Sequence, residues 1–158
     1  MTTTISNATM TVTLTESVTL NGSQQGATNT LSISNIDEIY KRIVTVPASE
    51  VEILAMSTAV TTGTFIESDV LYIRITNKDD TNHVGLIFKN ENDDEFGVKL
   101  DKGQSFIYNG DLAGGVVDTM DAQDGGADLA ANTFADLVNI TAIADTAACD
   151  VEIFVACK

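Results

Sequence analysis

The stretch from Met10 to Leu20, MTVTLTESVTL, alternates between apolar and polar side chains, with Glu16 as the one exception. Its even positions are Met, Val, Leu, Glu, Val and Leu, whereas its odd positions are all Thr or Ser. A period of two is typical of a β-strand with one apolar face. Asn21-Gly22 is a preferred turn sequence, and the alternation resumes at Leu31 and Ile33. The sequence therefore predicts a β-hairpin as its first element.

Two further strands are predicted on either side of Pro47, the only proline. The β-branched run at 43–46 favours a strand over 40–46, and Pro47 to Glu50 forms a turn before a strand at 51–56. The segment that precedes them allows an alternative. Asn35-Ile36-Asp37-Glu38 has the form of a helix N-cap, with apolar residues following at helical spacing, so a helical turn is the other interpretation there.

The middle of the chain predicts a β-meander. Strands are expected at 69–76, 84–88, 96–100 and 106–108, with polar turns at 77–82, 90–95 and 101–104. The turn at 77–82 is interpreted as the tip of a hairpin. The chain then closes with strands at 138–142 and 151–157, so its end is expected to lie within a sheet.

Together these segments predict one all-β domain over residues 1–158. The expected architecture is an antiparallel β-sandwich of the jelly-roll type, with about 8–10 short strands. We expect its core to be built from the apolar residues of the alternating segments: Val12, Leu14, Leu31, Ile33, Leu71, Ile73, Ile75, Leu86, Phe88, Val98, Val151 and Ile153.

Residues 109–132 interrupt this pattern. The segment is rich in Gly and Asp, has no periodicity, and is too long for an ordinary connection, so we interpret it as one long irregular loop, either functional or flexible. A helix from Asp128 to Leu137 is a weaker alternative at its end.

The charge balance excludes several classes of partner. The chain has 23 Asp and Glu against 8 Lys and Arg, a formal net charge of −15. Nucleic acid and anionic membrane surfaces would be repelled by such a protein. No segment approaches the roughly 20 apolar residues that span a bilayer, and the start MTTTI lacks the features of a signal peptide, so we expect synthesis in the cytoplasm.

Cysteine and histidine offer little chemistry. Cys149 and Cys157 lie in one predicted strand, about 26 Å apart if it is fully extended, which is too far for a disulfide within the chain. Buried thiols are the expected outcome, with a bridge to another subunit as the alternative. His83 is the only histidine and is expected to be an exposed turn residue. Within one subunit this excludes a catalytic triad whose base is a histidine other than His83, and it excludes a metal site built of several imidazoles.

Acidic clusters are the candidate site. One comprises Asp93, Asp94 and Glu95 in a turn, and another includes Asp121 and Asp124 in the long loop. Carboxylate oxygens suit Ca²⁺, but the spacing in the loop does not match a calcium-binding loop of the EF-hand type. No phosphate-binding or nucleophile motif is present either. We expect no enzyme, no catalytic residue and no cofactor, with a calcium- or carbohydrate-binding β-module as the alternative function.

Two stretches, Tyr72 to Val84 (YIRITNKDDTNHV) and Val98 to Phe106 (VKLDKGQSF), resemble small virion proteins of tailed bacteriophages. In that group an Ile-Arg-Asn strand and a Thr-Asn turn lead into a hairpin, and a Leu-x-x-Gly-Glu/Gln turn starts the next strand. The closing segment from Asp150 to Ala156 also looks like their final strand. Lys102 departs from the pattern, because a proline is frequent there, and 109–132 matches nothing in it.

The resemblance implies a jelly-roll module in the virion. It would be displayed as capsid decoration, or as part of a neck or tail fibre, without catalytic residues. The negative charge favours the outer surface, away from packaged DNA. Expected partners are other copies of the chain, with a trimer favoured, and a capsid or other virion protein. Four apolar residues are expected to be exposed and available for burial between subunits: Phe65, Ile87, Ile107 and Phe154.

Overall fold

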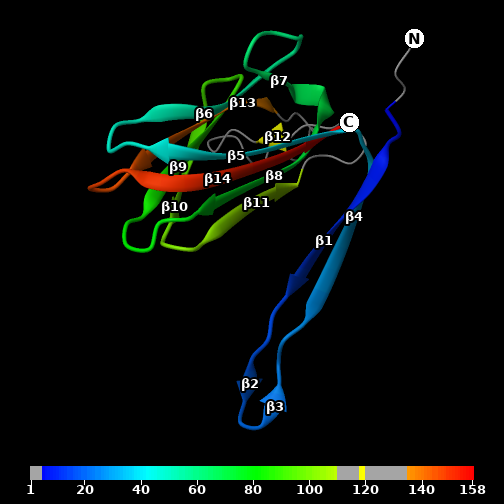
Figure 1. Cartoon of the computed structure of the whole chain (residues 1–158), viewed down its shortest axis with the longest axis vertical. Helices are drawn as coiled ribbons and strands as arrows, with labels where there is room; N and C mark the ends of the chain where they lie inside the picture. Colours follow the sequence, from blue (N-terminus) through cyan, green and yellow to red (C-terminus); the bar gives the residue numbers. More distant parts are fainter. Residues whose placement is uncertain (1–4, 110–117, 120–134) are drawn as a thin grey trace.

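The computed structural model describes residues 5–109, 118–119 and 135–158. It is an all-β protein whose antiparallel sheets pack as a sandwich, as the sequence predicts (Figure 1). Within the described residues the one helical segment is the single 3₁₀ turn η1 (Glu67–Asp69). None of the helical structure described is long and apolar enough to cross a membrane.

One sheet of the sandwich has the strand order β11-β8-β14-β5. Its strands are β11 (Ser105–Asn109), β8 (Val70–Asn77), β14 (Cys149–Cys157) and β5 (Glu38–Val46). The strand β14 shows why this sheet forms. Val151, Ile153 and Val155 are fully buried on its inner face, while Glu152 and Phe154 lie on the outer face. The predicted alternation of the final strand is confirmed.

The second sheet has the order β10-β9-β13-β6-β7. Its strands are β10 (Glu95–Leu100), β9 (Val84–Asn90), β13 (Ala135–Ala144), β6 (Val51–Ser57) and the short β7 (Phe65–Ile66), which runs parallel to β6. A further short strand, β12 (Asp118–Thr119), pairs with β13. The strands β5 and β14, first and last in the sandwich, lie side by side, and this order is compatible with a jelly roll.

The core fills the space between these two sheets. It joins residues from both, with Phe88 at 0% exposure among aromatic neighbours. Phe88 stacks on Phe96 of β10 with ring centroids 4.7 Å apart, and it meets Phe106 of the opposite sheet at 4.9 Å. Cys149 and Cys157 are free, buried thiols, as expected from their positions in one strand.

The predicted meander is wrong. The strands β8 and β9 belong to different sheets, so the segment 77–82 carries the chain across the sandwich and does not close a hairpin. The buried Asn77 fixes this crossing, because its Nδ2 donates to the carbonyls of Asn82 and Leu100. The chain returns between β10 and β11, and only β9 and β10 form the expected hairpin. A polar turn of this length can close a hairpin or connect strands of two different sheets, and the periodicity of the flanking strands does not distinguish the two.

The helical alternatives also fail where the structure describes them. The segment proposed as a helical turn is extended, because β4 ends at Ile36 and β5 begins at Glu38. Residues 135–137 of the proposed terminal helix lie in β13, while 128–134 are outside the described residues. Most of the loop predicted at 109–132 is likewise outside them.

The opening hairpin is confirmed, but it is not part of the sandwich. It pairs β1 (Ala8–Thr15) with β4 (Thr28–Ile36), and β2 (Thr19–Leu20) with β3 (Ser23–Gln24) at its tip. Asn21 and Gly22 both have positive φ, +50° and +79°, as a type I′ turn requires. This hairpin, here called the arm, runs away from the two sheets (Figure 1). Leu14, predicted to be a core residue, is 52% exposed on it.

Candidate functional site

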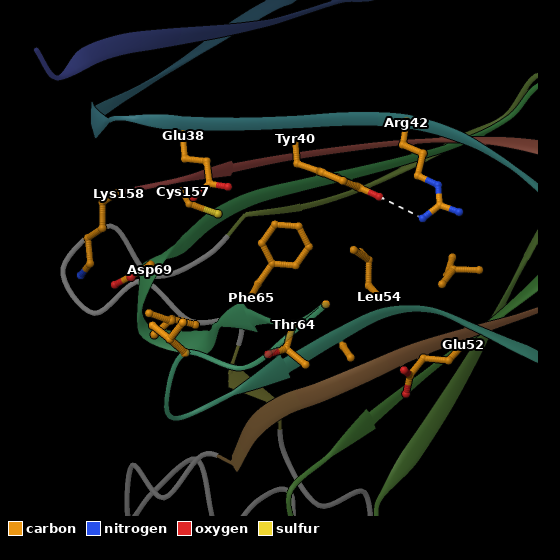
Figure 2. A pocket seen from close by; sticks show the side chains of 15 residues that line it. Glu38, Tyr40, Arg42, Glu52, Leu54, Thr64, Phe65, Asp69, Cys157 and Lys158 are labelled. Carbon is orange, nitrogen blue, oxygen red and sulfur yellow. Dashed lines mark hydrogen bonds between the residues drawn. The ribbon is translucent and has the colours of Figure 1, made fainter. Parts of the chain in front are cut away.

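Two surfaces of the described molecule are candidates for function. The first is a cleft at the open edge of the sandwich, here called the edge cleft, with a volume of about 520 Å³. It lies between β5, the edge strand of one sheet, and β6 and β7 of the other (Figure 2). The cleft exists because β5 and β6 are joined by the turn at Pro47, and no further strand is described beyond β5.

Aromatic side chains form the middle of the edge cleft. Figure 2 shows Phe65 pointing toward Tyr40, and their ring centroids are 5.3 Å apart at an edge-to-face angle of 75°. Arg42 donates from Nη1 to the Tyr40 hydroxyl at 3.4 Å. The arrangement places an aromatic pair in a cleft whose other lining residues include several polar and charged side chains.

Charged groups lie at both ends of the edge cleft. Glu38, Asp69 and Lys158 line one end, whereas Glu52 lies toward the other (Figure 2). Among the residues that the structure describes, no three His, Cys, Asp or Glu side chains gather closely enough to hold a metal ion. The carboxylates of this cleft are therefore spread along it and do not form a cation cage.

The thiol of Cys157 lines the same cleft but is poorly suited to attack a substrate. Burial, with Glu38 and Asp69 nearby, raises its pKa to about 12. Because the thiolate is the reactive form, a thiol with this pKa stays protonated and inert near neutral pH. The cleft is better suited to binding than to covalent chemistry.

The predicted acidic site at Asp93, Asp94 and Glu95 is a structural turn between β9 and β10. Asp93 accepts from Lys89 Nζ at 2.8 Å, and this hydrogen bond lowers the pKa of its carboxyl. Asp94 accepts from the side chain of Asn90 at 3.3 Å. Glu95 begins β10 and is exposed. Lys89 lies opposite Glu95 in the β9–β10 ladder, so this turn places a lysine beside both Asp93 and Glu95, and no metal-binding cluster forms among the described residues. Asp121 and Asp124 lie outside the described residues.

The buried Asn90 organises this turn and gave no signal in the sequence beyond its place in a polar run. Its Oδ1 accepts from the backbone of Asn92 and Asp94 at 3.0 and 2.9 Å. His83, expected to be an exposed turn residue, is about one-third exposed, with Nδ1 3.4 Å from Asp145 Oδ2. It lies before β9 and does not line the edge cleft.

One further carboxylate has an unusual environment. Burial raises the pKa of Glu67 in η1, and the nearby charges of Asp136 and Glu91 raise it further. Perturbed carboxyl groups are enriched at functional sites, but structural clusters also produce them. Glu67, Asp136 and Glu91 are not close enough together to bind a metal ion as a group.

The arm is the second candidate surface. Its base packs on the outer face of the β8–β14 sheet, where Ile33 and Ile36 are buried against Leu71, Tyr72 and Ala156. Beyond the base, its apolar side chains are uncovered: Leu14, Val18 and Leu20 are 52%, 52% and 62% exposed. Exposed apolar side chains that are grouped on one element are a feature of interaction sites.

Local sequence fixes the shape of the arm. Glu16 N donates to the Ala27 carbonyl and Gln25 N to the Val18 carbonyl, both at 2.8 Å, which joins the arm to its tip. Gly26 is required there, because a Cβ at this position would lie 1.9 Å from the Glu16 carbonyl oxygen. The tip is therefore held in line with the rest of the hairpin.

A groove separates the arm from β11. It has a volume of about 340 Å³ and is lined by Val12, Leu14, Asn29, Thr30, Leu31, Ile107 and Asn109. Of the four residues expected to be exposed for subunit contacts, Ile107 is 40% exposed and lines this groove. Phe65, Ile87 and Phe154 are only half-buried residues, and Phe154 packs edge-on against Tyr72. Leu14, Val18 and Leu20 of the arm are more exposed than these four residues. The sequence predicted one of the three, Leu14, to lie in the core.

Comparison with models of known protein families gives no match, and comparison with curated proteins gives none either.

Proposed function

We propose that this chain is a non-enzymatic structural protein displayed on the outer surface of a bacteriophage particle, as capsid decoration. The observation that carries the proposal is the arm, a hairpin that extends exposed apolar side chains away from the sandwich. Leu14, Val18 and Leu20 keep about half or more of their surface in water, and burying the remainder would contribute about 1–2 kcal/mol for each side chain. These side chains form a contact surface for assembly.

The distribution of charge supports an outer position. Glu16 is the only charged residue before Asp37, so residues 37–158 carry −14 of the net charge of −15. Packing that sandwich against packaged DNA would be strongly unfavourable. An acidic body with an arm that carries a single charge suits a protein that is attached to a shell and faces solvent. The resemblance of 72–84 and 98–106 to virion proteins of tailed bacteriophages agrees with this role.

The experiment is to test for the chain in purified phage particles by mass spectrometry, followed by cross-linking to identify its neighbours. We expect it in the particles, cross-linked to the capsid. Neighbours in the neck or tail would replace decoration by the fibre role. A chain found only in the soluble fraction of the infected cells would overturn the proposal of a virion protein.

Carbohydrate binding in the edge cleft is the second candidate function. The specific observation is that Tyr40 and Phe65 lie together between carboxylates that would accept hydrogen bonds from sugar hydroxyls. A glycan ligand should raise the melting temperature of the wild type, because a ligand that binds only the folded state stabilises it. The same glycan should leave Tyr40→Ala unchanged. A glycan panel without effect on the wild type would rule the cleft out as a sugar site.

A further inference from the structure

The edges of the arm are unusually unprotected. Among the described strands, β1 pairs only with β4, so each leaves one backbone edge free. Proteins normally protect such edges with lysine, proline or other charges. From Ile5 to Ile36 the chain contains no Lys, Arg or Pro, and Glu16 is its only charged residue. Beyond the register irregularity between Ala8 and Met10, the arm therefore lacks the lysines and prolines that commonly prevent association of strand edges.

The groove beside the arm has matching chemistry. None of its seven lining side chains is charged, and Val12, Leu14, Leu31 and Ile107 form its apolar part. The groove thus combines an apolar surface with neutral hydrogen-bonding groups from Asn29, Thr30 and Asn109. A segment with exposed Leu and Val and no charge would fit this surface, and the tip of the arm is such a segment.

Charge decides which partner fits best. Two copies of a chain at −15 repel each other unless they approach through neutral surfaces, and the arm and groove together provide both halves of such a contact. A basic partner, by contrast, would be drawn to the acidic sandwich and would find no charge to recognise on the arm. These features favour a second copy of this chain as the occupant.

We propose that the groove between the arm and β11 receives the arm of a second copy, so that the apolar stripes of two arms cover each other. The inference rests on the proposed structural function and names the partner of its contact surface. If each of two chains places its arm in the groove of the other, the contact forms a closed dimer. If each chain places its arm in the groove of the next, the contact forms a ring, such as the trimer expected from the sequence. The arms then form the joint, while the acidic sandwiches stay apart.

The first test is the mass of the full chain in solution, measured by size-exclusion chromatography with light scattering. We expect at least twice the mass of one chain. Leu20→Lys, at the exposed tip, should give the monomer mass and still unfold cooperatively in urea, because this residue makes no contact with the core. Val60→Lys, in the loop before β7 and 83% exposed, is the matched control and should keep the assembled mass.

The second test locates the contact. A chain with Ile107→Cys is mixed with a chain with Leu20→Cys under oxidising conditions, and the native cysteines remain because both are buried. We expect a disulfide-linked pair that contains one chain of each kind. Replacing Leu20→Cys by Val60→Cys should abolish it. A monomeric wild type, or cross-linking that does not discriminate between the two positions, overturns the inference.

These results separate the inference from the proposed function. A chain that is monomeric alone, but whose Leu20→Cys arm cross-links to the capsid on particles, overturns self-association and leaves the virion role standing. A chain that assembles through the groove but is absent from particles overturns the virion role and leaves the arm contact standing.

Discussion

The contact between Phe88 of β9 and Phe106 of β11 provides a direct test of the strand order. Their ring centroids are 4.9 Å apart although the two strands belong to opposite sheets. In the meander predicted from sequence, β9 and β11 would lie in one sheet on either side of β10, and these rings would not face each other. The test is a double-mutant cycle with Phe88→Ala and Phe106→Ala.

The expected magnitudes follow from burial and ring geometry. Phe88 is fully buried, so Phe88→Ala should lower the free energy of unfolding by about 3–5 kcal/mol. Phe106 is only partly buried, and its replacement should cost less. The coupling between the two is expected to be about 0.5–1.5 kcal/mol, the value for an aromatic pair beyond its area burial. Urea unfolding of the four proteins gives each free energy.

A matched control uses Phe154, which lies on the outer face and packs against Tyr72. The cycle of Phe88→Ala with Phe154→Ala should be additive to within about 0.3–0.5 kcal/mol. If Phe88→Ala is too unstable, Phe88→Leu serves in the same cycle. Additivity of the Phe88 and Phe106 changes would refute the argument that the two sheets face each other at this point.

Three further predictions concern single features of the sandwich. Asn77→Ala should lower the free energy of unfolding by about 2 kcal/mol, because it leaves the buried carbonyl of Leu100 and the partly buried carbonyl of Asn82 without their donor; a change too small to detect in urea unfolding would contradict its role in the crossing. Cys149 and Cys157 should resist alkylation in the native state at neutral pH, since burial raises the pKa of both thiols, and should react on unfolding; rapid native labelling seen by mass spectrometry would disprove their burial. Glu152 accepts a hydrogen bond from Arg74 that lowers the pKa of its carboxyl, with Lys41 adding to the effect. Its ionised form therefore stabilises the fold above the ordinary Glu pKa of about 4.3, and this contribution is lost as the pH falls through the lower folded value. Wild type should exceed Glu152→Gln in unfolding free energy at pH 7, the gap closing in acid, and a gap independent of pH would count against the ion pair.

Local pattern was sufficient for the strands but not for the connections between them. The alternation in 151–157 and 84–88 predicted the inward-facing buried positions correctly, because one face of each strand meets the core. Ala156, on the outer face, is buried as well, because the base of the arm covers it. The turn at Asn21-Gly22 was also predictable, since its backbone conformation is a local property. The turn at 77–82 was misassigned because its role depends on Asn77, whose partner Leu100 is 23 residues away.

The candidate sites likewise include residues that the sequence singled out and arrangements that only the folded structure reveals. The acidic triplet at 93–95 was visible in the sequence, but only the structure shows that Asp93 pairs with Lys89 and Asp94 with Asn90 instead of sharing a ligand. The edge cleft had no sequence signal, because Tyr40 and Phe65 come from strands of different sheets. Residues this far apart in the chain meet only once the sheets have packed.

The sequence by itself determined that this chain is all β, where most of its strands lie, that its two cysteines are buried and unpaired, and that its charge is strongly negative. These properties depend on side-chain period and composition, which need no knowledge of neighbours. Only the tertiary structure decided which sheet each strand joins and that the stripe beginning at Met10 leaves the core as an arm. A period of two indicates that one face of a strand is apolar. Whether that face is buried depends on the elements that pack against it. Along the outer part of the arm, the described residues leave it exposed.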